Sequence, residues 1–195
     1  VLPIAHEIKE RLEKLSFIEH VDIAGSLRRM KETIKDIDML VASNTPGKVM
    51  DFFTSMKNVR VVLAKGTTRS AVALKEGVNC DVRVLDKKNY GAGLLYFTGS
   101  KEHAVALRTY AVRKGYKLSE YGLFKRLKKK EHLVVCHREE DVYHALGMDY
   151  IPPEMRENQG ELDAALKHKL PKILGYDSVK GDLHMHTTWS DGLRS

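Results

Sequence analysis

The chain has 195 residues, of which 43% are hydrophobic and 30% are charged, and its formal net charge is +7. This composition is typical of a globular protein that buries a core, and no apolar run approaches the roughly 20 residues that span a bilayer, which argues against a membrane role. The positive charge indicates an acidic partner. Two cysteines without a Cys-x-x-Cys motif favour a reducing, cytoplasmic environment.

The first predicted elements are a helix over residues 3–15 and a strand over residues 17–24, from the spacing of their apolar residues. The strand ends at Gly25-Ser26, where a helix is predicted to open. Free backbone N–H groups at a helix start, with the helix dipole behind them, bind phosphate. This turn is therefore a candidate phosphate site.

The next predicted strand carries two carboxylates in Asp36-Ile37-Asp38. Because side chains alternate along a strand, the aspartates share one face and Ile37 points into the core. Carboxylate oxygens suit Mg²⁺ or Mn²⁺, which substrate phosphates usually help to bind. A Gly-Ser turn or an Asp-x-Asp alone is more often structural, but together in this order they indicate nucleotidyl transfer.

A helix beginning near Pro46 is followed by three predicted strands, over residues 59–64, 70–74 and 78–85. These elements predict a mixed sheet backed by helices. In the last strand Asp81 and Arg83 share a face, so Asp81 can join the first two aspartates. The alternative is that Asp81 and Arg83 only form an ion pair on the sheet surface.

The fourth motif is Tyr96-Phe97-Thr98-Gly99-Ser100. With it, the chain resembles the family X DNA polymerases, whose palm carries a Gly-Ser-x-Arg-Arg helix start, an Asp-x-Asp, a later strand aspartate and a Tyr-Phe-Thr-Gly-Ser turn in that order. The resemblance covers residues 3–157. It implies an α+β fold: a nucleotidyltransferase-type palm, with a mixed β-sheet backed by helices, plus a small α/β thumb subdomain.

The resemblance also implies roles for the motif residues. Asp36 and Asp38 would bind two Mg²⁺ or Mn²⁺ ions, and Asp81 only the catalytic one. Arg83 would pair with a metal-binding aspartate when the site is empty. The incoming deoxynucleoside triphosphate would contact the remaining motif residues: Gly25, Ser26, Arg29, Tyr96, Phe97 and Gly99.

Contacts with gapped or primer-template DNA are implied as well. Thr68 and Arg69 match DNA-backbone positions, although a simple surface turn explains them equally well, and Arg108 matches a residue facing the nascent base pair. Residues 101–138 hold eleven Lys or Arg against three Asp or Glu. We expect the densest part of this run to follow DNA phosphates, a solvated hairpin being the alternative: Lys125, Arg126, Lys128, Lys129 and Lys130.

Two positions depart from the family pattern. Lys35 stands where some members have a glycine whose amide contacts phosphate, and lysine keeps that amide. Ala104 stands where an asparagine commonly contacts the incoming base. Because alanine offers no donor, we expect weaker nucleotide binding or looser base discrimination.

After Ser100, a predicted N-cap, a helix over residues 101–114 is expected to turn Val105, Leu107, Ala111 and Val112 toward a core. Short strands over residues 116–124 and 132–135 and a helix over residues 139–146 complete the predicted thumb.

The end of the chain changes character. Residues 181–192 resemble the first metal-binding motif of the polymerase and histidinol phosphatase (PHP) domain, in which His184 and His186 would bind Zn²⁺ or Mn²⁺ in an incomplete site. We expect an internal piece of a larger prokaryotic polymerase that also carries a PHP 3′-5′ exonuclease or phosphoesterase. Its predicted parts are a palm (1–95), a thumb (96–160), a linker (161–180) and the truncated start of the PHP domain (181–195).

The sequence thus predicts DNA-templated nucleotidyl transfer in gap-filling repair, by a two-metal mechanism and as a monomer. Two alternatives are open. A non-catalytic DNA-binding fragment would result if the chain lacks the N-terminal module that grips DNA. A small-molecule nucleotidyltransferase would share the palm without needing the basic thumb.

Overall fold

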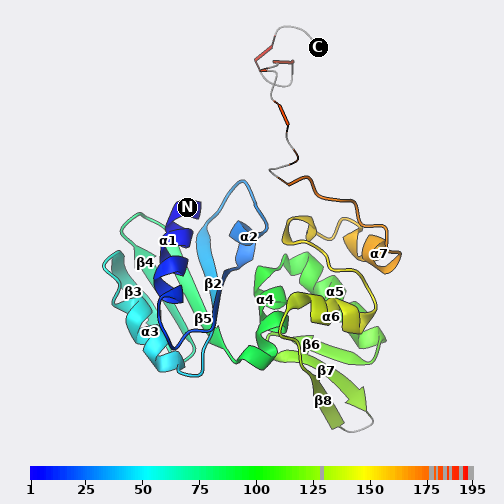
Figure 1. Ribbon diagram of the computed structural model, residues 1–195, viewed down its shortest axis with the longest axis horizontal. Coiled ribbons are helices and arrows are strands. Elements are labelled where there is room, and N and C mark those ends of the chain that lie inside the picture. The colour runs from blue at the N-terminus through cyan, green and yellow to red at the C-terminus, as the bar shows by residue number, and fades with distance from the viewer. Residues whose placement is uncertain are drawn as a thin grey trace.

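The computed structural model describes residues 1–127, 130–175, 178, 180–181, 184, 186–188 and 191–192. Two α/β parts follow one another along the chain, the first around a five-stranded sheet and the second around a three-stranded sheet (Figure 1). The predicted α+β fold, with a mixed sheet backed by helices, is confirmed. We refer to the two parts as the palm and the thumb.

The palm contains three helices and five strands in this order: α1 (Leu2–Glu13), β1 (His20–Ile23), α2 (Gly25–Arg28), β2 (Asp36–Ala42), α3 (Pro46–Thr54), β3 (Val59–Lys65), β4 (Arg69–Leu74) and β5 (Asn79–Leu85). Its strand order is β1-β2-β5-β4-β3. Strands β2 and β5 are parallel, whereas the other neighbours are antiparallel.

One face of the palm sheet is covered by α1 and α3 (Figure 1). Ile8 and Leu12 of α1 and Phe53 of α3 are completely buried in a cluster that also contains Ile37 and Val82 from the central strands. These strand residues alternate with half-exposed polar ones. Because of this alternation, the polar residues lie on the opposite face of the sheet, which is available for a site.

The thumb follows the 3₁₀ turn η1 (Lys87–Asn89) and consists of these elements: α4 (Tyr90–Thr98), α5 (Lys101–Arg113), β6 (Tyr116–Ser119), β7 (Gly122–Leu127), β8 (Lys130–Val134), α6 (Glu139–Leu146), η2 (Pro153–Met155) and α7 (Glu161–Leu166). The helix predicted over residues 139–146 is confirmed, as is the Ser100 N-cap, whose Oγ accepts a hydrogen bond from the His103 amide.

Helix α4 was not predicted, since the sequence indicated only a turn near its end. Most of its side chains are buried, so it has no polar face and no amphipathic period. Gly91 explains how it packs: a Cβ there would lie 2.2 Å from the Arg138 carbonyl oxygen. Only glycine lets α4 approach the start of α6 this closely.

The predicted core face of α5 was partly wrong. Leu107 and Ala111 are buried, but Val105 and Val112 are 46% and 54% exposed. The position one turn before Leu107 is His103, which is 1% exposed and bonded to Glu161 and Tyr143. A satisfied polar residue therefore continues the buried stripe, and the two valines flank it.

Part of the predicted linker over residues 161–180 is helical. Helix α7 buries Ala165 completely, and Leu162 and Leu166 pack on the same cluster as α5 and α6. The hydrophobic contacts of α7 attach this segment to the thumb.

A buried ion cluster joins the palm to the thumb. The Glu139 carboxylate accepts two hydrogen bonds from Arg28 of the palm, both 2.8 Å, and two from Arg156, at 2.6 and 3.1 Å. Arg156 is fully buried. Burial alone raises the pKa of Glu139, but the Arg28 hydrogen bonds and the Arg156 charge outweigh it and lower this pKa to about 2. Glu139 is therefore ionised at neutral pH, as both arginines require.

Replacement of Glu139 by alanine is expected to destabilise the protein by about 3–5 kcal/mol, because the buried Arg156 guanidinium loses its counter-charge. The free energy of urea unfolding measures this loss. The matched control is Glu131→Ala, which removes exposed ion pairs with Lys117 and Arg126 and should cost less than about 1 kcal/mol. Equal losses in the two variants would contradict the assignment.

Candidate active site

The pairing of β2 with β5 brings the predicted acidic residues together. In this parallel pair Asp38 lies opposite Asp81, and Asp36 lies opposite Asn79. Ile37 is completely buried between the two half-exposed or exposed aspartates of its strand. Three carboxylates from two neighbouring strands thus occupy the open face of the palm.

Burial and the neighbouring carboxylates change the protonation of Asp38. Burial, followed by the charges of Asp36 and Asp81, raises the pKa of Asp38 to about 6. A divalent cation would remove this repulsion, and the oxygen donor set suits Mg²⁺ or Mn²⁺. Within the described part of the chain, however, no three ligating side chains converge on one point.

Asp81 has an arginine partner on the neighbouring strand β4. Arg69 Nε donates a hydrogen bond to Asp81 Oδ1 at 3.0 Å. The predicted partner, Arg83, instead places its guanidinium over the Phe97 ring, 4.5 Å from the ring centroid. Arg69 and Arg83 face each other across the strands, so one takes the carboxylate and the other the aromatic ring. A cation that binds Asp81 through Oδ1 would have to displace Arg69.

Gly25 is needed for the close approach of β2. Its φ is +63°, and a Cβ at this position would lie 2.1 Å from Asp38 Oδ2. Helix α2, which starts here, has only four residues. The large helix dipole expected behind the Gly-Ser turn is therefore absent, and phosphate binding would depend more on nearby cations.

One cavity of about 410 Å³ collects the predicted nucleotide-binding residues. It lies between the palm and the thumb and also contains Asp36, Asp38 and Arg108. Besides Ala104, the lining contains three residues that the sequence interpretation did not assign to the site: Thr98, Ser100 and Lys101. Thr98 and Ser100 belong to the Tyr-Phe-Thr-Gly-Ser motif, which was the available signal. The predicted group consists of Gly25, Ser26, Arg29, Tyr96, Phe97 and Gly99.

Helix α5 contributes one wall of this cavity. Ala104 and Arg108 both line it, one helical turn apart. The Arg108 Nε donates to the Ala104 carbonyl oxygen at 3.2 Å, and its guanidinium lies 5.8 Å from the centroid of the Tyr96 ring. Alanine leaves the Ala104 position of the wall without a side-chain donor.

The basic cluster of the thumb does not join the cavity. Lys125 and Arg126 lie on β7 and Lys130 begins β8. These strands extend away from α2 and from the start of β2 (Figure 1). Lys128 and Lys129 lie outside the described residues. Thr68, in the turn before β4, accepts a hydrogen bond from the Val84 amide through its carbonyl oxygen. DNA contacts by these residues stay predictions.

The two histidines of the C-terminal motif lie close together, with 3.3 Å between their Nε2 atoms. His186 Nδ1 is also bonded to Asp191. As noted for the aspartates, the described residues contain no group of three metal-ligating side chains. The PHP assignment therefore stays a prediction.

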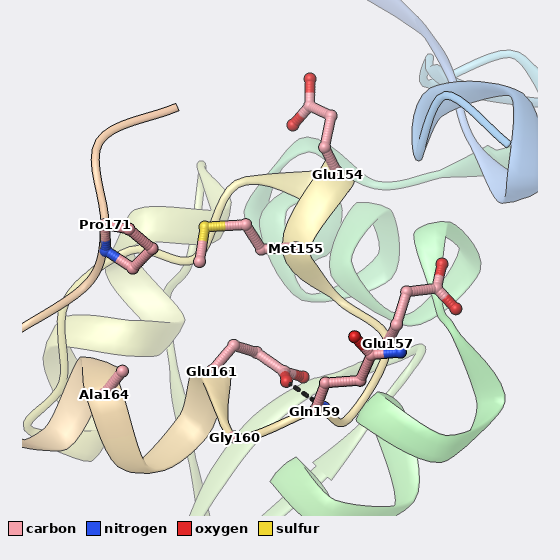
Figure 2. A pocket seen from close by; sticks show the side chains of 8 residues that line it. All are labelled: Glu154, Met155, Glu157, Gln159, Gly160, Glu161, Ala164 and Pro171. Atoms are coloured by element: carbon pink, nitrogen blue, oxygen red, sulfur yellow. Dashed lines mark hydrogen bonds between the residues drawn. The ribbon is translucent and has the colours of Figure 1, made fainter. Parts of the chain in front are cut away.

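A second cavity, of about 340 Å³, lies between the segment after η2 and helix α7 (Figure 2). Its polar lining includes Glu154, Glu157 and Glu161, and Met155 and Pro171 supply apolar surface. A triphosphate would be repelled by these carboxylates. This cavity is thus a poor nucleotide site, unlike the one beside Arg29.

Among the described residues, no helix has the length and apolar character needed to cross a membrane.

Comparisons with known proteins agree with this geometry. The family described as DNA polymerase beta thumb matches residues 93–157. The DNA polymerase/3′-5′ exonuclease PolX of Bacillus subtilis is 35% identical over 193 residues, which cover 98% of this chain and 33% of that protein. The repair DNA polymerase X of African swine fever virus is 27% identical over 78% of this chain and 90% of its own length.

The crystal structure of Leishmania infantum polymerase beta in a ternary P/T complex has a TM-score of 0.68, with 24% identity over 80% of this chain and 74% of that chain. The palm and the thumb together have the fold of polymerase beta. The chain belongs to the family X DNA polymerases. It spans about a third of the length of its Bacillus relative.

The metal-free site is expected to be electrostatically strained, so Asp38→Asn should stabilise the protein. Because the pKa of Asp38 is raised, stability falls as pH rises from about 4 to about 6, and the penalty persists above pH 6. After allowance for solvent screening, Asp38→Asn should gain about 1–2 kcal/mol at pH 7.5 in EDTA. Thermal unfolding measures the gain, and Glu76→Gln, at an exposed turn, is the control. A lower melting temperature for Asp38→Asn in EDTA would refute the strain.

Proposed function

We propose that this chain is the catalytic core of a DNA polymerase that fills gaps during DNA repair by templated nucleotidyl transfer. The observation that supports this most directly is the single cavity in which the Gly-Ser turn, the Tyr-Phe-Thr-Gly-Ser segment and two aspartates meet. The third aspartate, Asp81, lies beside Asp38 in the strand register. The similarity to polymerases from a bacterium and a virus supports the same activity.

In this proposal Asp36, Asp38 and Asp81 hold two Mg²⁺ or Mn²⁺ ions, which when bound would activate the primer 3′-hydroxyl and neutralise phosphate charge. Arg29 and the backbone amides of Gly25 and Ser26 orient the triphosphate of the incoming deoxynucleotide. Tyr96, Phe97 and Gly99 lie against its sugar. Arg69 balances the charge of Asp81 until the ions bind.

Gapped or primer-template DNA is the proposed polymeric substrate. Residues 101–138 of the thumb hold eleven Lys or Arg against three Asp or Glu, so DNA affinity should fall as salt concentration rises. Arg108 would face the nascent base pair, and Thr68 and Lys125 would contact the DNA backbone. We further propose that the protein acts as a cytoplasmic monomer, and that His184 and His186 begin a PHP domain with Zn²⁺- or Mn²⁺-dependent 3′-5′ exonuclease activity.

A non-catalytic DNA-binding role is the second candidate. It is favoured by one observation, the Arg69–Asp81 ion pair, in which Arg69 competes with a cation for Asp81 Oδ1. Primer extension on gapped DNA with Mg²⁺ or Mn²⁺ separates the two. Extension by the chain supports the polymerase, whereas tight DNA binding without extension supports the second role.

Asp81→Asn is expected to lower the primer-extension rate by more than about 100-fold. The reason is that the variant lacks a carboxylate that would hold the ion beside the primer 3′-hydroxyl. Nucleotide binding should persist, since the proposed triphosphate contacts lie in the cavity and Asp81 is not among its lining residues. Single-turnover extension and nucleotide titration measure the two effects. Asp163→Asn, on the exposed surface of α7, removes the same charge and should leave both unchanged. Full activity of Asp81→Asn would exclude the assigned role.

Ala104→Asn should lower the KM for the incoming deoxynucleotide by about 5-fold, because the asparagine supplies a hydrogen bond worth roughly 1 kcal/mol. Steady-state extension with varied nucleotide concentration measures it. The control is Ala106→Asn, on the same helix but outside the cavity lining. An unchanged KM for Ala104→Asn, or an equal change in both variants, would show that the missing amide is not limiting.

A further inference from the structure

Arg29 is held by two hydrogen bonds at the rim of the nucleotide cavity. Its Nε donates to Glu157 Oε1 at 3.0 Å, and its Nη1 donates to the Thr98 carbonyl oxygen. The side chain is only 13% exposed. Two contacts to different nitrogens fix the plane of the guanidinium. Neither contact uses Nη2, so this nitrogen can donate to an anion in the cavity.

Glu157 itself occupies a rigid place in the thumb. The preceding residue, Arg156, is fully buried and bonded to Glu139. The next two backbone amides both donate to the Glu161 carboxylate, at 2.8 and 2.7 Å. The Glu157 side chain points away from Pro171 and α7 (Figure 2). The Glu157 carboxylate therefore faces the palm from a backbone that is held in place. A residue that orients another side chain needs such a fixed position.

The same carboxylate gathers a second cation. Lys31 Nζ lies 3.5 Å from Glu157 Oε1. Two positive side chains and one negative one leave a net charge of +1 in this group, so Glu157 does not cancel the attraction for a triphosphate. Glu157 accepts a single hydrogen bond from Arg29 Nε and does not form a bidentate pair with the guanidinium. Other Arg29 donors are therefore left for phosphate.

We propose that Glu157 is a positioning residue: from the thumb, it holds the Arg29 guanidinium in the orientation that receives the triphosphate of the incoming nucleotide. This rests on the proposed function, because Arg29 lines the proposed nucleotide cavity. Triphosphate binding by the palm thus depends on a thumb side chain. The alternative is that Glu157 merely competes with phosphate for Arg29.

The test compares Glu157→Ala with Glu157→Gln in the complete 195-residue chain. Both variants remove the same negative charge, but only glutamine keeps an oxygen that can accept the Nε hydrogen bond. The dissociation constant of inorganic tripolyphosphate with Mg²⁺ is measured by calorimetry. Glu157→Ala should bind about 5- to 10-fold more weakly than Glu157→Gln, because binding must then immobilise a freely rotating arginine.

Two controls test whether the effect of the Glu157 substitutions depends on Arg29. In the Arg29→Ala background the difference between the two Glu157 variants should disappear. Glu154→Ala and Glu154→Gln change an exposed carboxylate that lines the neighbouring cavities, and should bind tripolyphosphate equally. In primer extension, the difference between the Glu157 variants should affect the KM for nucleotide and leave kcat unchanged, whereas a loss of folded protein would lower the rate at all nucleotide concentrations.

Equal affinities of Glu157→Ala and Glu157→Gln would overturn the positioning role, as would a difference that persists without Arg29. If both variants bind tripolyphosphate more tightly than the unmodified chain and to the same extent, Glu157 competes with phosphate for Arg29. If the unmodified chain extends primers while the Glu157 variants are equal, only the positioning role fails. If the unmodified chain neither binds tripolyphosphate nor extends a primer, the proposed function fails as well.

Discussion

The parallel pairing of β2 with β5 is the constraint on which the site depends. It places Asp38 directly beside Asp81, although like charges in such positions repel each other. The core residues of the two strands hold this register, because a shift by one residue would turn the aspartates inward and Ile37 and Val82 outward. Hydrophobic burial on one face thus holds like charges close together on the other. The pKa of Asp38 is raised first by its own burial and then by the charges of Asp36 and Asp81. A bound cation would relieve this repulsion.

Two adjacent arginines at the end of α2 join the palm to the thumb in different ways. Arg28 points to the buried Glu139 and completes a cluster with the fully buried Arg156. Arg29 points to the more exposed Glu157 at the edge of the nucleotide cavity. The Arg28–Glu139 pair is stable because breaking it would leave a buried charge without its partner. The second lies where an anionic ligand can reach it, so neighbouring residues of one motif divide into a structural and a functional contact.

Much of the candidate site was predictable from short motifs. Asp36, Asp38 and Asp81 stand out because strand alternation puts polar residues on one face, and the Gly-Ser and Tyr-Phe-Thr-Gly-Ser segments carry strong turn signals. Helix α4 was missed because its burial on all sides removes the period that reveals a helix. The buried role of His103 was missed because its partners, Glu161 and Tyr143, are 58 and 40 residues away. The basic run at residues 125–130 was assigned to DNA by charge, but charge alone does not say which end of the thumb it occupies.

The sequence by itself determined which chemical groups the protein carries: the three carboxylates, the Gly-Ser turn, the order of the strands along the chain and the basic run over residues 101–138. These follow from local spacing, since alternation and turn geometry act over a few residues. Only the tertiary structure decided which groups pair. That Asp81 bonds to Arg69 and not to Arg83, and that Arg29 bonds to Glu157, are outcomes of competition among several nearby partners. Which partner is chosen depends on differences of a few ångströms between side chains that are distant in the sequence. Residue spacing along the chain does not contain this information.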